Sequence, residues 1–123
     1  PVFYLQYAYA RICNILTKAE SLGHKINQTG DLNVLNTEIE KNILRKLHQF
    51  SELIIKIGQV LEPQILANYL QNLSSLFHKF YVQNKVVSEK NDLTNARLLL
   101  INGIKIVLKN GMKILGVNTP EKM

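Results

Sequence analysis

The chain opens with the stretch Phe3-Tyr4-Leu5-Gln6-Tyr7-Ala8-Tyr9-Ala10-Arg11. An α-helix turns about 100° per residue, so two residues seven positions apart lie within roughly 20° of each other on its surface. A helix over this stretch therefore places Tyr4 and Arg11 on one side, with Tyr7 about 60° away, and Lys18 extends that side. A separate stripe, at the spacing of a core-facing helix side, consists of Leu5, Ala8, Ile12, Leu16 and Ala19. We predict a helix from about residue 2 to residue 22.

The side that carries Tyr4, Tyr7 and Arg11 has two interpretations. Aromatic rings stack on nucleic acid bases, and arginine binds phosphates or base edges. Alternatively, the two tyrosines are half-buried packing residues and the arginine is solvated. The spacing alone leaves both interpretations open.

The composition is that of a globular protein with a single core. The chain has 123 residues, of which 46% are hydrophobic and 20% are charged. No apolar run reaches the length of a transmembrane helix, and no secretory signal opens the chain, so we expect no membrane association. The single cysteine, Cys13, excludes an intramolecular disulfide and indicates a reducing compartment, which we expect to be the cytoplasm. Because the chain begins with Pro1 rather than methionine, we expect it to be part of a longer protein.

The chain is basic, with a net charge of +6 and a pI near 9.5. This charge indicates an anionic partner, and nucleic acid is favoured over a membrane surface. The lysines are spread along the chain rather than clustered, so ordinary solvation is the alternative explanation.

Local signals divide the middle of the chain into helices. Gly23 is a candidate C-cap for the first helix, and a loop is expected over residues 23–35. A capping box formed by Thr37 and Glu40 opens a second helix, and Ser51 is a candidate N-cap for a short third helix. The apolar residues of that third helix are Ile54, Ile57, Val60 and Leu61.

Two longer helices complete the predicted fold. Pro63 suits the first position of a fourth helix, and Asp92 is a candidate N-cap for a last helix that runs to about Leu115. Gly103 and Gly111 share one side of this last helix, which indicates that another helix packs closely there. No segment favours a strand, so we predict an all-α bundle of about five helices.

The motifs of common enzymes are missing from the sequence. No glycine-rich loop follows a strand as a phosphate site requires, and the spacing of His24, His48 and His78 is not that of metal ligands. The capping box accounts for Glu38 and Glu40, which leaves little support for catalysis by paired carboxylates. We expect no metal, no cofactor and no independent catalysis in this segment.

A second aromatic and basic pattern lies near the end of the fourth helix. Phe77, Tyr81 and Lys85 follow one another at intervals of four residues. Phe77 is expected in the core, whereas Tyr81 and Lys85 can face outward where the helix meets a loop. The repetition of this pattern on a second helix favours binding of single-stranded nucleic acid.

Several motifs occur together in the order known from one family. They are Pro1 to Arg11, Leu44-Arg45-Lys46-Leu47 with Phe50, Leu61-Glu62-Pro63 with Leu66-Ala67-Asn68-Tyr69-Leu70, Phe80-Tyr81, Ala96-Arg97-Leu98, Leu108-Lys109-Asn110-Gly111, and Leu115-Gly116-Val117 with Pro120-Glu121-Lys122-Met123. Over essentially its whole length, the chain resembles the C-terminal anticodon-binding domain, of the DALR type, of arginyl-tRNA synthetase.

The resemblance implies a class I aminoacyl-tRNA synthetase that joins arginine to its tRNA with the use of ATP. Residues 1–123 would form a single helical anticodon-binding domain, while ATP and arginine would bind an upstream catalytic domain. The implied partners are this catalytic domain and the anticodon stem-loop of tRNA(Arg). The implied anticodon-binding residues are Tyr4, Tyr7, Arg11, Tyr81, Lys85 and Met123, the last with its terminal carboxylate.

The chain departs from the family pattern in places. Tyr9 stands where the family usually has histidine, Ser51 where proline is common, and Lys85 where arginine or an aromatic residue is frequent. Residues 23–35 match no part of the pattern. Two alternatives stay open: a related anticodon domain of another specificity, such as that of the cysteinyl enzyme, and a helical protein-interaction module that binds no RNA.

Overall fold

The computed structural model describes residues 2–54 and 62–123. Its elements are α1 (Val2–Ser21), the 3-10 helix η1 (Leu32–Val34), α2 (Glu38–His48), α4 (Pro63–Gln83) and α5 (Asn91–Ile114). Residues 50–54 are also helical, as expected for the start of the predicted third helix, but its apolar positions 57, 60 and 61 lie outside the described residues. No strand occurs in the two described ranges, which confirms the all-α prediction.

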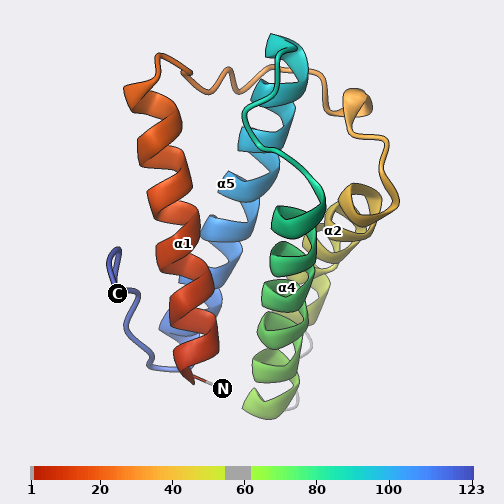
Figure 1. Ribbon diagram of the computed structural model, residues 1–123. Coiled ribbons are helices and arrows are strands. Elements are labelled where there is room, and N and C mark those ends of the chain that lie inside the picture. The colour runs from red at the N-terminus through yellow and green to blue at the C-terminus, as the bar shows by residue number, and fades with distance from the viewer. Residues whose placement is uncertain (1, 55–61) are drawn as a thin grey trace.

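Helix α5 is the centre of the bundle. It contacts α1, α2, α4 and η1, and α4 in turn contacts both α1 and α2 (Figure 1). The residues after α5 return along the outer side of α1, where the Gln6 side-chain amide donates a hydrogen bond of 3.0 Å to the carbonyl of Asn118. The largest fully buried side chains come from all four of these helices: Tyr9, Ile12, Ile43, Leu66, Leu70, Leu73, Phe77, Phe80, Leu98, Leu100, Ile101 and Ile104.

The predicted helix ends are largely confirmed. Gly23 and Gly116 have positive φ angles of 90° and 75°, the conformation that glycine permits at a helix C-terminus. The Thr37 hydroxyl accepts from the amide of Glu40 while the Glu40 side chain accepts from the amide of Thr37, so the capping box is present. Pro63 occupies the first turn of α4.

Two predicted N-caps are wrong. The amide of Leu53 donates to the carbonyl of Gln49 at 3.1 Å, which places Ser51 inside the helical turn rather than at its cap. In α5 the N-cap is Lys90 and Asp92 lies in the first turn, where its negative charge still suits the helix dipole. The hydroxyl of Ser88 accepts from the amide of Lys90 at 3.0 Å, and this loop contact starts the helix earlier than predicted.

The expected close packing at the two α5 glycines is confirmed. A methyl group added to Gly111 would lie 2.7 Å from Cδ1 of Leu70 in α4, closer than real carbon contacts allow. At Gly103 the corresponding neighbour is Cδ1 of Leu47 in α2, at 3.2 Å. Both α2 and α4 therefore approach α5 at positions that lack a side chain.

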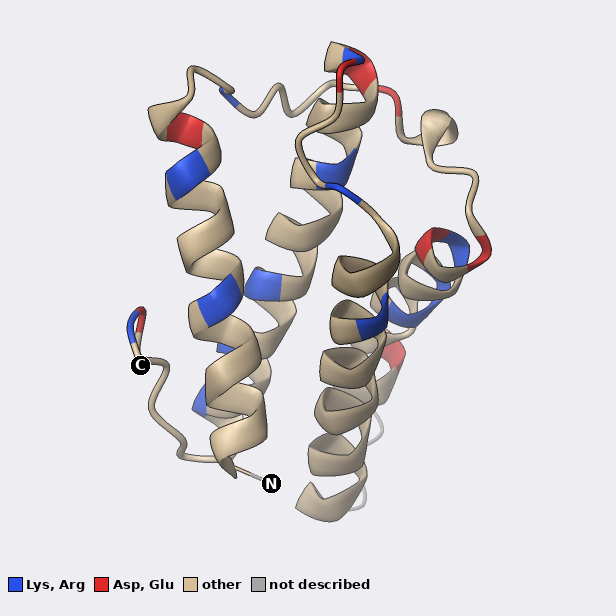
Figure 2. Ribbon diagram, in the orientation of Figure 1, with Lys and Arg blue, Asp and Glu red and all other residues tan. Residues whose placement is uncertain are grey.

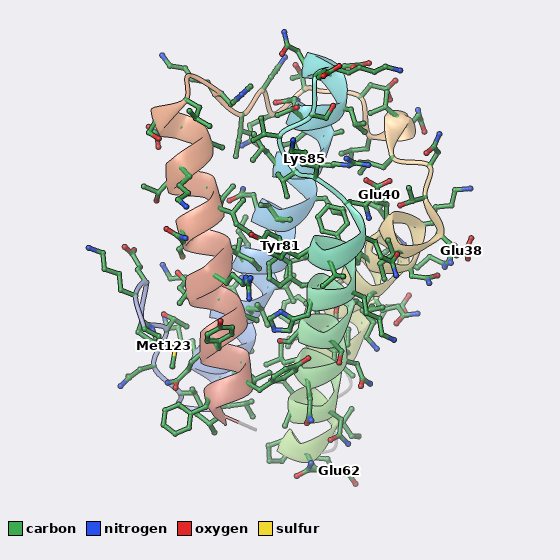
Figure 3. All side chains as sticks on the ribbon, in the orientation of Figure 1. Glu38, Glu40, Glu62, Tyr81, Lys85 and Met123 are labelled. Atoms are coloured by element: carbon green, nitrogen blue, oxygen red, sulfur yellow. The ribbon has the colours of Figure 1, made fainter. Side chains whose placement is uncertain are left out.

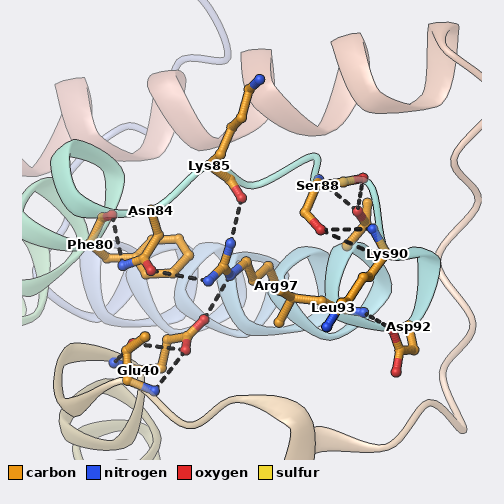
Figure 4. Close-up of polar contacts among 11 residues, drawn as sticks. Glu40, Phe80, Asn84, Lys85, Ser88, Lys90, Asp92, Leu93 and Arg97 are labelled. Atoms are coloured by element: carbon orange, nitrogen blue, oxygen red, sulfur yellow. Dashed lines mark hydrogen bonds and ion pairs between the residues drawn. The ribbon is translucent and has the colours of Figure 1, made fainter.

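A buried ion pair joins α2 to α5, and the sequence did not predict it. The Arg97 Nε donates to a carboxylate oxygen of Glu40 at 2.8 Å, and the Glu40 side chain is fully buried. The remaining nitrogens of Arg97 donate to the carbonyl of Lys85 at 2.7 Å and to the side-chain oxygen of Asn84 at 3.0 Å (Figure 4). Thr37 donates to the other carboxylate oxygen, so this pair also fixes the start of α2 and the loop after α4.

We expect this pair to make the stability of the chain sensitive to acid. Burial alone raises the pKa of the Glu40 carboxyl, but hydrogen bonds from Arg97 and Thr37 and the charge of Arg97 outweigh burial, so the pKa is lowered. A lowered pKa stabilises the fold above the unfolded-state value of about 4.3, and this contribution is lost as the pH falls through the folded-state pKa. Urea unfolding between pH 7 and pH 3 should show a smaller acid-induced loss in Glu40→Gln than in the wild-type chain. Equal losses would contradict this role of Glu40.

Candidate nucleic-acid interface

A surface pocket of about 610 Å³ lies over the exposed side of α1. Its lining includes Tyr7 and Arg11 from α1, Tyr81 from α4 and residues 121–123 of the tail. We call it the α1 pocket. Figure 3 shows Tyr81 and Met123 on opposite sides of α1, so the pocket extends across the helix from α4 to the tail. Four of the six predicted site residues thus line one cavity: Tyr7, Arg11, Tyr81 and Met123.

The guanidinium group of Arg11 lies close to two tyrosine rings of the α1 pocket. Its central carbon is 4.5 Å from the ring centroid of Tyr81 and 5.8 Å from that of Tyr7. Tyr7 and Tyr81 are 49% and 38% exposed, so both rings keep free surface for a ligand. The pocket therefore offers a planar cation and two phenol rings, groups that stack on unpaired bases and donate to base edges or phosphates.

Tyr4 and His78 lie behind this surface rather than in the lining. The ring centroid of His78 is 5.2 Å from that of Tyr4 and 6.1 Å from that of Tyr7, and the Tyr4 hydroxyl shares a 3.1 Å hydrogen bond with Ser75. Burial, and then the charge of Arg11, lowers the pKa of His78, so its imidazole is neutral near pH 7. The packing interpretation thus fits Tyr4 better than it fits Tyr7.

The second predicted stripe is divided between core and surface. Phe77 is fully buried, as expected, and its ring centroid is 6.1 Å from that of Tyr81. Lys85 is exposed, but it does not line the α1 pocket, and its backbone carbonyl binds Arg97. In Figure 4 its side chain projects away from Arg97. The structure therefore does not bring Lys85 together with the other predicted site residues.

Charge on the molecule is not concentrated at this pocket. Figure 2 shows Lys and Arg distributed over α1, α2, α4 and α5. The local cations in the lining are Arg11 and Lys122, and the same lining includes the carboxylate of Glu121. Specific binding here would therefore depend on the arrangement of these few groups rather than on a broad basic surface.

Tyr9 does not line the α1 pocket, but it lies near the tail, a placement that periodicity could not predict. Tyr9 is 2% exposed, and its pKa is raised by burial first, then by Cys13 and by the charge of Glu121, while hydrogen bonding with Thr119 opposes the shift. Thr119 and Glu121 of the tail thus lie near the buried Tyr9 of α1. In the sequence, Tyr9 differs from the histidine that the family usually has at this position. This difference alone did not predict that Tyr9 lies near the tail.

A metal site and a membrane-spanning helix are both absent from the described part of the chain. Within residues 2–54 and 62–123, no three His, Cys, Asp or Glu side chains come close enough to hold a metal ion. None of the helices in that part of the chain combines the length and apolar character needed to cross a membrane.

The fold and the α1 pocket define a small all-α domain with an aromatic and cationic surface cavity. Comparison with known families matches residues 5–123 to the DALR anticodon binding domain. The chain belongs to this family, which confirms the resemblance inferred from its motifs.

Relatives from several organisms agree with this assignment. An arginine–tRNA ligase from Desulforamulus reducens is 41% identical over 125 residues, which cover 100% of this chain and 22% of the relative. An arginine–tRNA ligase from Acinetobacter baylyi is 42% identical, with 99% of this chain and 21% of the relative covered. The solved arginyl-tRNA synthetase of Thermus thermophilus superposes with a TM-score of 0.84 at 28% identity, over 98% of this chain and 21% of that chain. The chain thus spans about a fifth of the length of these relatives.

Proposed function

We propose that this chain is the anticodon-binding domain of an arginine–tRNA ligase and that the α1 pocket holds bases of the anticodon loop of tRNA(Arg). The observation that carries the proposal is the convergence of Tyr7, Arg11 and Tyr81 on one cavity, in a chain of the DALR family. Flipped loop bases are held in proteins by stacking on aromatic or guanidinium planes and by hydrogen bonds to their edges. The α1 pocket presents both kinds of group.

The proposal extends to the parent enzyme. The relatives called arginine–tRNA ligases are about five times as long as this chain. The catalytic domain that binds ATP and arginine would lie in the part of the parent enzyme outside this chain. Such an enzyme would join arginine to tRNA in the cytoplasm. The domain described here would then contribute tRNA affinity and selection rather than the chemical step.

The genetic code defines which anticodon base a domain that selects tRNA(Arg) must recognise. Every arginine codon has G at its middle position, so every arginine anticodon has C there. A domain that recognises tRNA(Arg) therefore has one base in common to all its substrates, and that base is the natural occupant of the α1 pocket.

Binding of an arginine anticodon stem-loop to the chain should weaken as the salt concentration rises. Each phosphate that a basic side chain neutralises contributes about 0.7 to the negative slope of log affinity against log salt for single strands. Fluorescence anisotropy of a labelled stem-loop, titrated with the 123-residue chain at several salt concentrations, measures this slope. Absence of binding at low salt would contradict the proposed function and favour a protein-interaction module.

A further inference from the structure

Glu121 is an unexpected residue to find in a cavity proposed for a polyanion. Among the residues that line the α1 pocket, it contributes a side-chain carboxylate, and Arg11 and Lys122 contribute the positive charges. A carboxylate repels phosphate, so Glu121 cannot assist binding through the phosphate oxygens of the RNA. It can assist through a group on a base that donates a hydrogen bond.

Glu121 is an exposed residue of the tail rather than of a helix. The carbonyl of Asn118 accepts from Gln6 at 3.0 Å, and the amide of Val117 donates to Met112 at 2.8 Å, which anchors the start of the tail on α1 and α5. Tyr9, a buried residue of α1, lies close enough to Glu121 for that charge to contribute to the raised pKa of the Tyr9 hydroxyl. Glu121 thus follows three residues after Asn118 and lines the α1 pocket from the tail.

Cytosine and uracil differ in the group that such a carboxylate would meet. Cytosine carries an amino group at C4, which donates hydrogen bonds, whereas uracil carries a carbonyl oxygen there, which accepts them. Carboxylates are the usual acceptors for the cytosine amino group in proteins that read bases. A carboxylate facing the uracil oxygen would instead leave two acceptors opposed.

We propose that Glu121 is a specificity-determining residue that accepts a hydrogen bond from the 4-amino group of a cytosine held in the α1 pocket. Through this contact the pocket favours cytosine over uracil at the middle anticodon position. The inference rests on the proposed function, because it assumes that anticodon bases enter this pocket. It assigns selection to the tail, while Tyr7, Arg11 and Tyr81 supply stacking surfaces that every base can use.

The test compares two stem-loops that differ only in the middle anticodon base, C or U, and measures the ratio of their dissociation constants. Glu121→Gln keeps the shape of the side chain, but its amide can donate to uracil as well as accept from cytosine. We expect this variant to lower the C-over-U ratio by about tenfold relative to the wild-type chain. Removal of a negative charge can strengthen binding of both loops together, so the ratio rather than either affinity is the readout.

A matched control is available in Glu20→Gln, which removes the same charge from the exposed surface of α1 outside the pocket. This control should leave the ratio unchanged. If the wild-type chain favours the C loop and Glu121→Gln retains the full ratio, the role of Glu121 is overturned while the proposed function stands. If the wild-type chain binds neither loop, the proposed function fails, and this inference fails with it.

Discussion

Replacement of Arg97 by methionine should lower the free energy of unfolding by about 3–5 kcal/mol, because it leaves a buried carboxylate without its charge partner. Glu40 is fully buried, and Arg97 also donates to the carbonyl of Lys85 and the side chain of Asn84. Loss of Arg97 therefore leaves three acceptors, from α2 and from the loop before α5, without this donor. Urea unfolding followed by far-UV circular dichroism measures the change.

Two further variants separate the buried charge from other effects of the substitution. Arg45→Met removes the guanidinium of an exposed pair, in which Arg45 and Glu38 lie 3.6 Å apart, and should cost at most about 1 kcal/mol. The double variant Glu40→Gln/Arg97→Met removes the unpaired charge while it keeps a side-chain oxygen for the capping box. It should therefore be more stable than Arg97→Met alone. Similar small losses for Arg97→Met and Arg45→Met would contradict the buried ion pair.

Replacement of Arg11 by alanine should weaken binding of the arginine anticodon stem-loop by about 1–3 kcal/mol, or roughly 5–150-fold in the dissociation constant. Arg11 lies 4.5 Å from the ring centroid of Tyr81, so its planar group is already oriented within the α1 pocket. Arg11→Lys should restore only part of the affinity, because a point ammonium cannot reproduce the planar fork of donors. Anisotropy titration of the labelled stem-loop measures the loss.

Lys18→Ala is the matched control for this prediction, because Lys18 is an exposed cation of α1 that does not line the pocket. Loss of Lys18 should reduce the affinity for the stem-loop only slightly, because it lowers the net positive charge of the chain without changing the pocket. The melting temperature of each variant shows whether the fold is intact, since Arg11 also packs on the neighbouring tyrosines. If Arg11→Ala binds the stem-loop as well as Lys18→Ala does, Arg11 supplies only long-range charge.

The helices could be predicted from the sequence because their signals are local. The stripe of Leu5, Ala8 and Ile12 is buried as its period predicts, and the glycines and the capping box act within one helical turn of the ends they define. The two errors have the same origin. Ser51 and Asp92 are good capping residues, but contacts of neighbouring residues, such as that of Ser88 with Lys90, set the actual helix starts.

The site could be predicted only in part, because its remaining contacts join distant segments. Tyr7 and Arg11 are neighbours on one helix, so their common face follows from spacing. The packing of His78 against Tyr4 depends on how α4 lies against α1, and the pairing of Arg97 with Glu40 spans 57 positions. No periodicity encodes either contact.

The tail is the part of the site that the sequence predicts least. Residues after Gly116 have no helical period, so the sequence alone did not place them on α1. The family resemblance pointed to Met123, and the structure puts it in the α1 pocket, but neither the motif nor its spacing drew attention to the carboxylate of Glu121.

Selection of the arginine anticodon by this domain can be measured with two stem-loops, one with C and one with U at the middle anticodon position, by comparing the affinity of the wild-type chain for each. A single wrong base in a recognised site typically costs about 1–3 kcal/mol. We therefore expect the loop with the middle C to bind roughly 5–150-fold more tightly at physiological salt. Equal affinity for the two loops would contradict the claim that this domain reads the arginine anticodon.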